Sequence, residues 1–319
     1  MRVLVIGHSG QDGKLLVEDL RNADHSIFGF SGKSYFSSEE IKLSVQPKLE
    51  DIESLKYLLK VFKPDQIYYL AAYNKSAEEK DLEDIQEDFL KYQLVNSTGL
   101  LNVLVAMKEE LPKTRLFYAS SSLIYSGEGD VPLDESSPMI PNGFYGITKA
   151  EGVWIAEYFR KVYGLFVSVG ILFNHESGYR KESFLTQKII RGAIRIASGS
   201  NEKLILGDLD ARVDWSYAFD FIEAFQKILS CNEPDTYIVA SGESHSVAEF
   251  AEQTFAFFNL NASDYLLENK QLLNRKSTLR VGNPSKLITK TGWKRSIDFK
   301  TFVQQLIKDT LVELERKQT

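Results

Sequence analysis

Short apolar runs recur through the first half of the chain, and segments with a single apolar face separate them. The runs are RVLVIG (2–7), SIFGF (26–30), DQIYYLAA (65–72), TRLFYAS (114–120) and LFVSVGIL (165–172). A strand that is apolar along its whole length is buried on both faces, as happens when helices cover both sides of a parallel sheet. The pattern therefore predicts an α/β fold built on a doubly wound parallel sheet.

The separating segments predict helices. SLKYLLKVF (54–62) runs up to Pro64, which cannot continue a helix because it has no N–H and clashes with the preceding turn. QLVNSTGLLNVLVAMKEE (93–110) predicts a long helix that is mostly apolar on one side. After about residue 173 the pattern changes, and a smaller α/β lobe is expected. Its helices are expected near 184–199, 216–230, 246–258 and 298–316, with short strands such as KLILG (203–207) and TYIVAS (236–241) between them.

The composition is ordinary for a soluble globular protein, with 43% hydrophobic and 26% charged residues among 319. The net charge of −6 argues against non-specific binding to nucleic acid or to an anionic membrane, because both need clustered cations. No apolar run approaches the ~20 residues that span a bilayer, and the N-terminal run is too short and too polar for a signal peptide. Cys231 is the single cysteine, which excludes an intrachain disulfide and fits a cytoplasmic protein.

A glycine-rich loop follows the first expected strand. In VLVIGHSGQDGKLLVEDL, Gly7 permits a tight turn, Gly10 permits close approach of a pyrophosphate, and Gly13 permits helix–strand packing. The free N–H groups at the start of the next helix would bind the phosphates. The spacing G-x-x-G-x-x-G within a strand–loop–helix unit predicts dinucleotide binding. The expected cofactor site also includes Gln11, Asp12, Leu70, Ala71 and Ala72.

The position of the glycine-rich loop near the start of the chain predicts which part binds the cofactor and which part binds the substrate. Residues 1–173 are expected to form a Rossmann domain that binds the dinucleotide, with later segments at roughly 206–240 interleaved in it. Residues 174–319 are expected to form mainly the substrate-binding lobe.

The end of the second strand bears on the choice of cofactor. NAD binding needs an acid about 20 residues after the loop to accept from the ribose 2′-hydroxyl, but this strand ends in Ser31, Gly32, Lys33 and Ser34. Lys33 and Ser34 could hold a 2′-phosphate, although most lysines are simply solvated. The missing acid favours NADP over NAD. Asp51, with Ile52 after it, is expected to accept from the adenine amine, or else to cap a helix.

FYGITKAEGVWIAEYF places Tyr145 and Lys149 four residues apart, on one face of a helix. A phenol with a pKa of ~10 is a poor base at neutral pH. A cation about 4 Å away contributes up to ~4 kcal/mol, enough to lower that pKa by roughly three. The pair follows a serine-bearing strand, YASSS (118–122), so it predicts general acid–base catalysis. Lys149 would also contact the nicotinamide ribose.

With these motifs the chain resembles an extended short-chain dehydrogenase/reductase, and most nearly the branch of GDP-mannose 4,6-dehydratases and GDP-4-keto-6-deoxymannose reductases. The resemblance covers nearly the whole chain. It is carried by GQDG (10–13), PDQIYYLAA (64–72), YGLFVSVGILFNHES (163–177), LGDLDARVDWSYAFDFIEAF (206–225), IVASGESHSVAEF (238–250) and VGNPSKLITKTGW (281–293).

The resemblance implies roles for single residues. Ser121, Tyr145 and Lys149 would form the catalytic set, with Ser121 bonding the oxygen at C4 of the sugar and Ser122 as the second choice. The resemblance implies a GDP-linked nucleotide sugar, which would be held by Asn174, Lys188, Arg191, Arg212 and Arg275. His175 is expected to be a structural hydrogen-bonding residue, and the four histidines show no metal-ligand spacing.

Leu123 is a departure from the branch. The dehydratases read Ser/Thr–Ser–Glu where this chain reads Ser121–Ser122–Leu123, and the glutamate is the implied acid–base group for C5. Losing such a group typically costs roughly 10²–10⁴-fold in rate. The branch's arginine before Asp-Trp is Val213 here, with Arg212 displaced by one position. An acidic stretch, KSAEEKDLEDIQEDF (75–89), either reshapes the sugar pocket or, as we rather expect, forms a solvated helix face.

These observations favour an NADP-dependent oxidoreductase that transfers a hydride at C4 of a nucleotide-activated hexose or heptose, as a 4-keto sugar reductase or the reverse dehydrogenase. A 4,6-dehydratase with its acid supplied elsewhere is the main alternative, with Glu128, Asp134, Glu135 and Glu176 as candidate acids. A 4-epimerase and a non-catalytic cofactor-binding regulator are lesser alternatives. Helices around 93–110 and 146–163 are expected to form a homodimer contact, with a tetramer left open.

Overall fold

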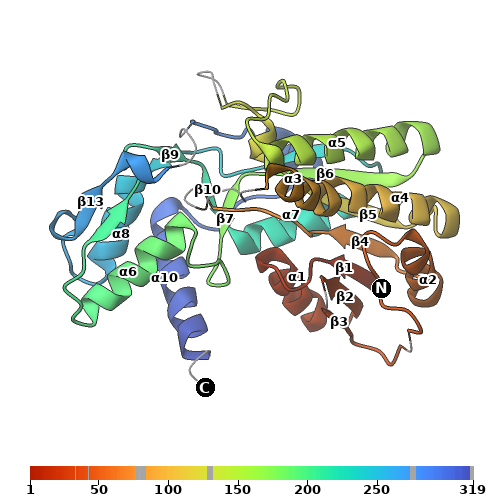
Figure 1. Ribbon diagram of the computed structural model, residues 1–319, viewed down its shortest axis with the longest axis horizontal. Helices are drawn as coiled ribbons and strands as arrows, with labels where there is room; N and C mark the ends of the chain where they lie inside the picture. The colour runs from red at the N-terminus through yellow and green to blue at the C-terminus, as the bar shows by residue number, and fades with distance from the viewer. Residues whose placement is uncertain are drawn as a thin grey trace.

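The computed structural model describes residues 1–32, 34–41, 43–76, 79, 84–127, 132–273 and 278–316. Its centre is a seven-stranded sheet with the order β11-β6-β5-β4-β1-β2-β3 (Figure 1). Neighbouring strands are parallel except β3, which runs antiparallel to β2. The strands are β1 (Arg2–Ile6), β2 (Ser26–Ser31), β3 (Ser34–Ser37), β4 (Gln66–Tyr69), β5 (Arg115–Ser121), β6 (Phe166–Leu172) and β11 (Thr236–Val239). The predicted doubly wound parallel sheet is confirmed.

Alternate residues of the central strands enter two separate cores. In β1, Leu4 and Ile6 pack into one apolar cluster, whereas Val3 and Val5 pack into another. The first cluster includes side chains of α2 (Ile52–Phe62), α4 (Gly99–Glu110) and α5 (Phe144–Tyr163), and the second includes those of α1 (Gln11–Asn22) and α7 (Ala218–Ser230). Because both sides of the central strands are covered, these strands do not alternate polar with apolar positions.

The long helix expected over 93–110 has a different form. α3 (Ile85–Gln93) runs into a π-helical turn, Leu94–Thr98, before α4 begins at Gly99. Such turns widen the helix by one residue and are frequent at functional sites. Asn96, in this turn, is fully buried and hydrogen-bonds to Tyr73 and Thr148. The side-chain bonds of Asn96 therefore tie the turn to two other segments.

The C-terminal lobe has its own core. α6 (Leu185–Ala197), α8 (Val247–Phe257) and α10 (Phe299–Arg316) pack Ile189, Phe250 and Leu306 together. These helices and α7 match the four expected helices within two residues. Three short strand pairs complete the lobe: β7 (Asn174–Glu176) with β10 (Trp215–Tyr217), β9 (Arg212–Val213) with β12 (His245–Ser246), and β8 (Leu204–Leu206) with β13 (Leu266–Glu268). The chain also contains α9 (Ser285–Thr291).

β11 and α7 belong to the sheet although they come late in the chain. β11 pairs with β6 along four residues, and α7 covers one face of the sheet. The division into a cofactor domain and a substrate domain stays a prediction. Within the described residues, no helix is long and apolar enough to cross a membrane.

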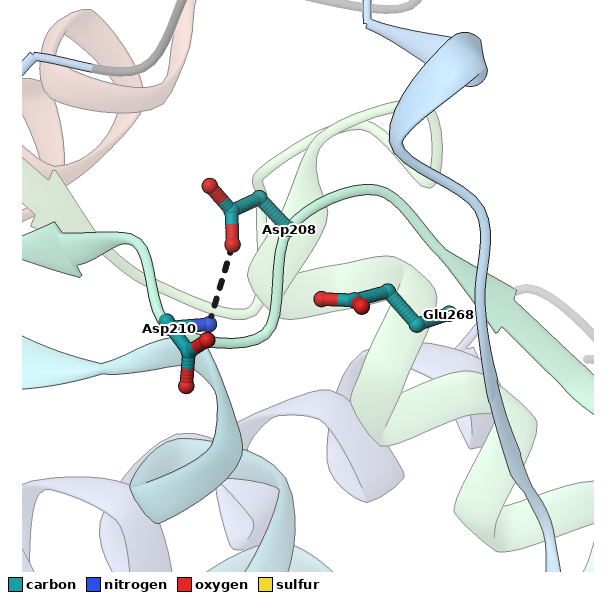
Figure 2. A group of neighbouring side chains, drawn as sticks. All are labelled: Asp208, Asp210 and Glu268. Atoms are coloured by element: carbon teal, nitrogen blue, oxygen red, sulfur yellow. Dashed lines mark hydrogen bonds between the residues drawn. The ribbon is translucent and has the colours of Figure 1, made fainter.

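Three carboxylates meet where β8 and β13 end. Oxygen atoms of Asp208, Asp210 and Glu268 lie within 4.8 Å of one another (Figure 2). The Lys270 ammonium lies 3.1 Å from Asp208 and 3.6 Å from Glu268, and backbone N–H groups donate to both carboxylates. The lysine and the backbone thus account for this acidic group without a metal ion.

Candidate active site

An open pocket of about 1310 Å³ lies along the carboxyl ends of the central strands. Its wall includes the glycine loop, the ends of β4, β5 and β6, and residues of the C-terminal lobe. Pockets for one small ligand usually measure ~300–1,000 Å³. This pocket is large enough for two ligands, and its place fits the rule that open α/β sheets bind ligands at the carboxyl ends of their strands.

The glycine loop has the geometry that a dinucleotide requires. Gly7 has a φ of +96°, and a Cβ there would lie 2.5 Å from the backbone nitrogen of Ala71. A Cβ on Gly13 would lie 2.2 Å from the carbonyl oxygen of Gly7. Gly10 begins α1 without a side-chain cap, so the N–H groups of the first turn remain available to an anion at the pocket wall. Leu70, Ala71 and Ala72 line the same pocket.

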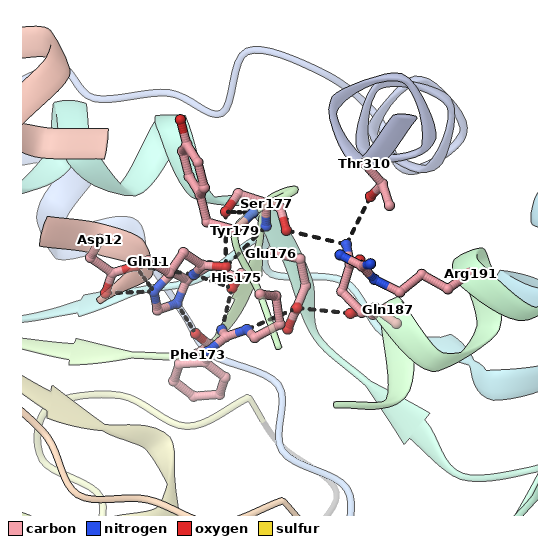
Figure 3. A network of polar contacts seen from close by, with 12 residues as sticks. Gln11, Asp12, Phe173, His175, Glu176, Ser177, Tyr179, Gln187, Arg191 and Thr310 are labelled. Carbon is pink, nitrogen blue, oxygen red and sulfur yellow. Dashed lines mark hydrogen bonds and ion pairs between the residues drawn. The ribbon is translucent and has the colours of Figure 1, made fainter. Parts of the chain in front are cut away.

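The side chains of Gln11 and Asp12 face the C-terminal lobe (Figure 3). The Gln11 amide oxygen accepts from the N–H and the hydroxyl of Ser177, at 3.1 and 3.0 Å, and its nitrogen donates to the carbonyl of His175 at 3.0 Å. His175 Nε2 lies 3.0 Å from Asp12 Oδ1. Burial would raise the pKa of Asp12, but the charges of His175 and Arg180 outweigh it and lower that pKa to about 2. The side chains of Gln11 and Asp12 are thus bonded to the C-terminal lobe, and at these two positions the backbone N–H groups are what a cofactor could bind.

The same network continues into α6 and α10 (Figure 3). Gln187 on α6 donates to Thr310 on α10 at 2.8 Å and to the carbonyl of Ser177 at 3.3 Å. Its amide oxygen accepts from Arg191 Nε at 3.0 Å. Arg191 lines the pocket, so its position depends on bonds that begin at the glycine loop. Arg180 and Thr186 form a parallel branch, because both donate to the buried carboxylate of Glu176.

The predicted catalytic residues meet at the end of β5. Ser121 lines the pocket, and its hydroxyl accepts from the N–H of Leu123 at 3.2 Å. Tyr145 and Lys149 on α5 also line the pocket, with Lys149 Nζ 5.7 Å from the centre of the Tyr145 ring. Lys149 is 1% exposed and donates to the carbonyl of Ala119 at 2.7 Å. Burial lowers the pKa of Lys149 to about 7, partly opposed by Asp12.

Comparison with known proteins identifies the family. A sequence profile of the family described as GDP-mannose 4,6 dehydratase matches residues 4–306. The chain belongs to the GDP-mannose 4,6-dehydratase family. GDP-mannose 4,6 dehydratase 2 of Arabidopsis thaliana is 32% identical over 99% of this chain and 88% of its own length. The human GDP-mannose 4,6 dehydratase is 35% identical over 79% of this chain and 71% of its own length. The predicted resemblance to this branch is confirmed.

Solved structures agree on the fold of this family member. dTDP-glucose 4,6-dehydratase from Bacillus anthracis, in complex with NAD, superimposes with a TM-score of 0.83 at 20% identity, covering 99% of this chain and 98% of the other. RMD from Pseudomonas aeruginosa, complexed with NADPH, superimposes with a TM-score of 0.80 at 23% identity, covering 99% of both chains. Both likenesses support the Rossmann-type architecture.

Leu123 takes part in the site of this dehydratase-family chain. It lines the pocket together with Ser121 and Tyr145. Of the four alternative acids, Glu128 lies outside the described residues, while Asp134 accepts from Ser136 and Glu135 accepts from the N–H of Ile238. Neither Asp134 nor Glu135 lines the pocket; Glu176 does, but it is bonded to Arg180 and Thr186.

Several other predicted site residues lie away from the pocket wall. Ser122 is buried in the short helical turn Ser122–Ile124, and Lys188 lies on α6 outside the lining residues. Arg212 bonds to Ser244, and Ser34 donates to the carbonyl of Ser31. These four residues do not line the pocket, and their roles in binding or catalysis stay predictions. Asn174 and Arg191 do line it.

Asp51, Ile52 and Lys33 are predicted cofactor residues, and Arg275 is a predicted residue for the nucleotide sugar. The Asp51 carboxylate accepts from the N–H groups of Glu53 and Ser54, which is the helix-capping alternative, and neither Asp51 nor Ile52 lines the pocket. Lys33 and Arg275 lie outside the described residues. Ser31 and Gly32, at the end of β2, do line the pocket.

The acidic stretch is only in part the expected solvated face. Residues 84–87 of the stretch are exposed, but Asp88 is fully buried. The prediction of a solvated face is wrong for Asp88, because its carboxylate is paired with Lys75, 2.5 Å away, and bonded to Tyr73. Tyr73 lines the pocket. One signal in the sequence points to this position, since Tyr73 directly follows Ala71 and Ala72 in the loop after β4.

Proposed function

We propose that this chain is a nicotinamide-dependent enzyme that converts a GDP-linked sugar, with GDP-mannose as the leading substrate, to its 4-keto-6-deoxy derivative. The observation that carries the proposal is the family match over residues 4–306, together with relatives named as GDP-mannose 4,6 dehydratases. These relatives favour the dehydratase alternative over the reductase that the sequence motifs favoured. The epimerase alternative has support from likeness of fold alone.

The glycine loop fits a dinucleotide, because Gly7 and Gly13 leave no room for a side chain and the start of α1 offers N–H groups. When bound, the nicotinamide supplies hydride exchange with C4 of the sugar. Tyr145 takes the proton from the C4 hydroxyl as the ketone forms, and Ser121 orients that oxygen. Lys149 stabilises the phenolate of Tyr145 through its positive charge.

NADP is the proposed cofactor. The described end of β2 brings Ser31 and Gly32 to the pocket wall, and no acid stands there to accept from a ribose 2′-hydroxyl. Several solved structures of the same fold contain NAD, and the Pseudomonas aeruginosa structure contains NADPH. Titration of the protein with both cofactors tests the choice, and tighter binding of NAD would contradict it.

A reductase or dehydrogenase that acts only at C4 is the second candidate. Leu123 favours it, because a leucine side chain cannot carry the proton from C5 and occupies the position of the family's acid. This candidate uses the same Ser121, Tyr145 and Lys149 for the same hydride transfer.

Two reactions distinguish the candidates. The purified protein is incubated with GDP-mannose and NADP, without added reductant, and the sugar is identified by nuclear magnetic resonance. A 4-keto-6-deoxy product supports the dehydratase. If no such product forms, and NADPH is oxidised only when a 4-keto sugar nucleotide is added, the dehydratase proposal is wrong and the second candidate stands.

A further inference from the structure

A second phenol lines the same pocket as Tyr145. Tyr73 follows β4, and its backbone is held on both sides by one amide: its N–H donates to Asn96 Oδ1 at 2.9 Å, and its carbonyl accepts from Asn96 Nδ2 at 3.1 Å. Asn96 Nδ2 also lies 3.1 Å from the hydroxyl of Thr148, the residue before Lys149. Tyr73 is therefore held in a fixed position relative to α5, which carries the catalytic pair.

The phenol is bonded to a buried ion pair. Tyr73 Oη donates to Asp88 Oδ1 at 3.2 Å, and the other oxygen of Asp88 lies 2.5 Å from Lys75 Nζ. The side chain of Asp88 is 0% exposed and that of Lys75 is 12% exposed. An ion pair this deeply buried contributes little to stability, because desolvation of the charges offsets their attraction. Stability alone therefore does not explain a carboxylate at this place.

Aromatic packing connects this group to the catalytic tyrosine. The ring of Tyr92 lies 4.7 Å from that of Tyr73 and 6.5 Å from that of Tyr145. Asn74, next to Tyr73, also lines the pocket, and its buried Oδ1 has no hydrogen-bond partner within the described residues. A buried acceptor without a partner is costly, so a ligand hydroxyl at this part of the wall would satisfy it.

Burial raises the pKa of Tyr73, and the neighbouring Asp88 carboxylate raises it further. The phenol therefore keeps its proton at neutral pH. A protonated phenol can take up a proton from a substrate only if it passes its own proton on at the same time. Asp88 is the acceptor in line for that transfer.

We propose that Tyr73, backed by Asp88 and Lys75, contacts the sugar and transfers the protons at C5 and C6 for which Leu123 provides no acid. The proposal rests on the dehydratase function proposed above. It assigns that stage to a group outside the serine cluster of β5.

The proton transfers begin on a sugar that is already oxidised at C4. The C5–H bond breaks, its proton bonds to Tyr73 Oη, the phenol's own proton moves to Asp88, and the electron pair enters the enolate formed with the C4 ketone. In return Asp88 gives its proton back to Tyr73, which protonates O6. The C6–O6 bond then breaks and water leaves, which gives a C5=C6 double bond conjugated with the C4 ketone. The hydride taken from C4 returns to C6, and Tyr73 donates its proton to C5. The proton that Tyr145 took from the C4 hydroxyl is released to solvent, and solvent returns a proton to Tyr73, so the protons balance over the whole reaction.

Tyr73→Phe tests the proposal on the full-length protein with GDP-mannose and NADP. Two readouts separate the stages: absorbance of the reduced nicotinamide reports oxidation at C4, and deuterium uptake at C5 in heavy water reports the proton transfer. We expect oxidation at C4 to continue, whereas C5 exchange and product formation fall by roughly 10²–10⁴-fold, the usual cost of losing an acid–base group. Asp88→Asn should slow the same stage, and Lys75→Met combined with Asp88→Asn avoids leaving a buried unpaired charge if the single variant does not fold.

Tyr69→Phe is the matched control. This substitution also removes a phenol oxygen, which in the wild type donates to the carbonyl of Val95, the residue before Asn96. Tyr69 itself does not line the pocket. Wild-type C5 exchange in Tyr73→Phe would overturn the proposal, as would equal losses in Tyr73→Phe and Tyr69→Phe. If the wild-type protein itself oxidises C4 without exchange at C5, the dehydratase function fails, and the role of Tyr73 fails with it.

Discussion

Lys149 is the buried cation of the proposed catalytic set. Its ammonium is removed from water, it donates to the carbonyl of Ala119, and it lies 5.7 Å from the Tyr145 ring. Removing a cation from water makes its charge less stable, which is why the pKa falls to about 7. The same low polarity strengthens its attraction for a phenolate. Burial thus strengthens the attraction between the Lys149 ammonium and a Tyr145 phenolate. It also lowers the affinity of Lys149 for its own proton.

Tyr145→Phe is expected to reduce turnover by at least roughly 10²-fold, because it removes the group that takes the C4 proton. The ring remains, so its packing against Tyr92 and the affinity for the dinucleotide should change little. Steady-state rates and a cofactor titration measure the two quantities. Near-normal turnover in this variant would rule out Tyr145 as the proton acceptor.

Leu123→Glu is expected to restore product formation to the Tyr73→Phe variant by roughly 10-fold or more, because it places a carboxylate on the same pocket wall. Leu123→Gln has nearly the same shape as the glutamate but cannot act as a base. Product formation from GDP-mannose is measured in both double variants. An equal gain in the two would mean that shape, and not the carboxylate, restores activity.

The elements of the fold follow closely from the chain's patterning, and the exceptions have local causes. The apolar runs identify the buried strands because covering both faces excludes polar residues from them. The π-helical turn at Leu94–Thr98 is not visible in the sequence, since it depends on bonds from Asn96 to distant segments. The pairing of Lys75 with Asp88 is hidden for the same reason. A charged residue in an acidic stretch gives no sign that its side chain turns inward.

Asp12→Asn is expected to destabilise the fold at neutral pH by about 2 kcal/mol, because the native pKa of Asp12, about 2, lies below its ordinary 3.8. A carboxylate whose pKa is lower in the folded protein stabilises the fold at pH values above its ordinary pKa. This stabilisation is lost as the pH falls from 3.8 towards 2. Urea unfolding of the wild type and the variant at several pH values measures the difference. The gap between the two proteins should close with acidification, and a gap independent of pH would contradict the assignment.

At the scale of the whole molecule, α5 presents an apolar stripe to solvent. Ile147, Trp154, Tyr158 and Val162 are 41–55% exposed and recur at helical spacing, and Leu101 on the adjacent α4 is 37% exposed. Apolar groups gathered on one face are typical of a protein–protein contact. The α4–α5 face is therefore the proposed homodimer interface (Figure 1).

Trp154→Glu is expected to convert a dimer to a monomer, since a carboxylate at the centre of an apolar contact loses its hydration without a partner. Sedimentation velocity at micromolar concentration measures the change. Val312→Glu, which alters an exposed apolar residue on α10, is the control and should leave the dimer intact. A monomeric wild-type protein would refute this interface.

The position of β11 has a consequence for protein engineering. This strand covers the side of β6 but is encoded about 60 residues after it, beyond the strands that begin the lobe. A fragment that stops at residue 173 would leave β6 as an uncovered apolar edge, ready to pair with other copies, and would remove His175 from Asp12. Exchange of sugar-binding lobes between relatives thus needs junctions on both sides of α7 and β11, because a single crossover after the sixth strand would also exchange these two elements of the sheet.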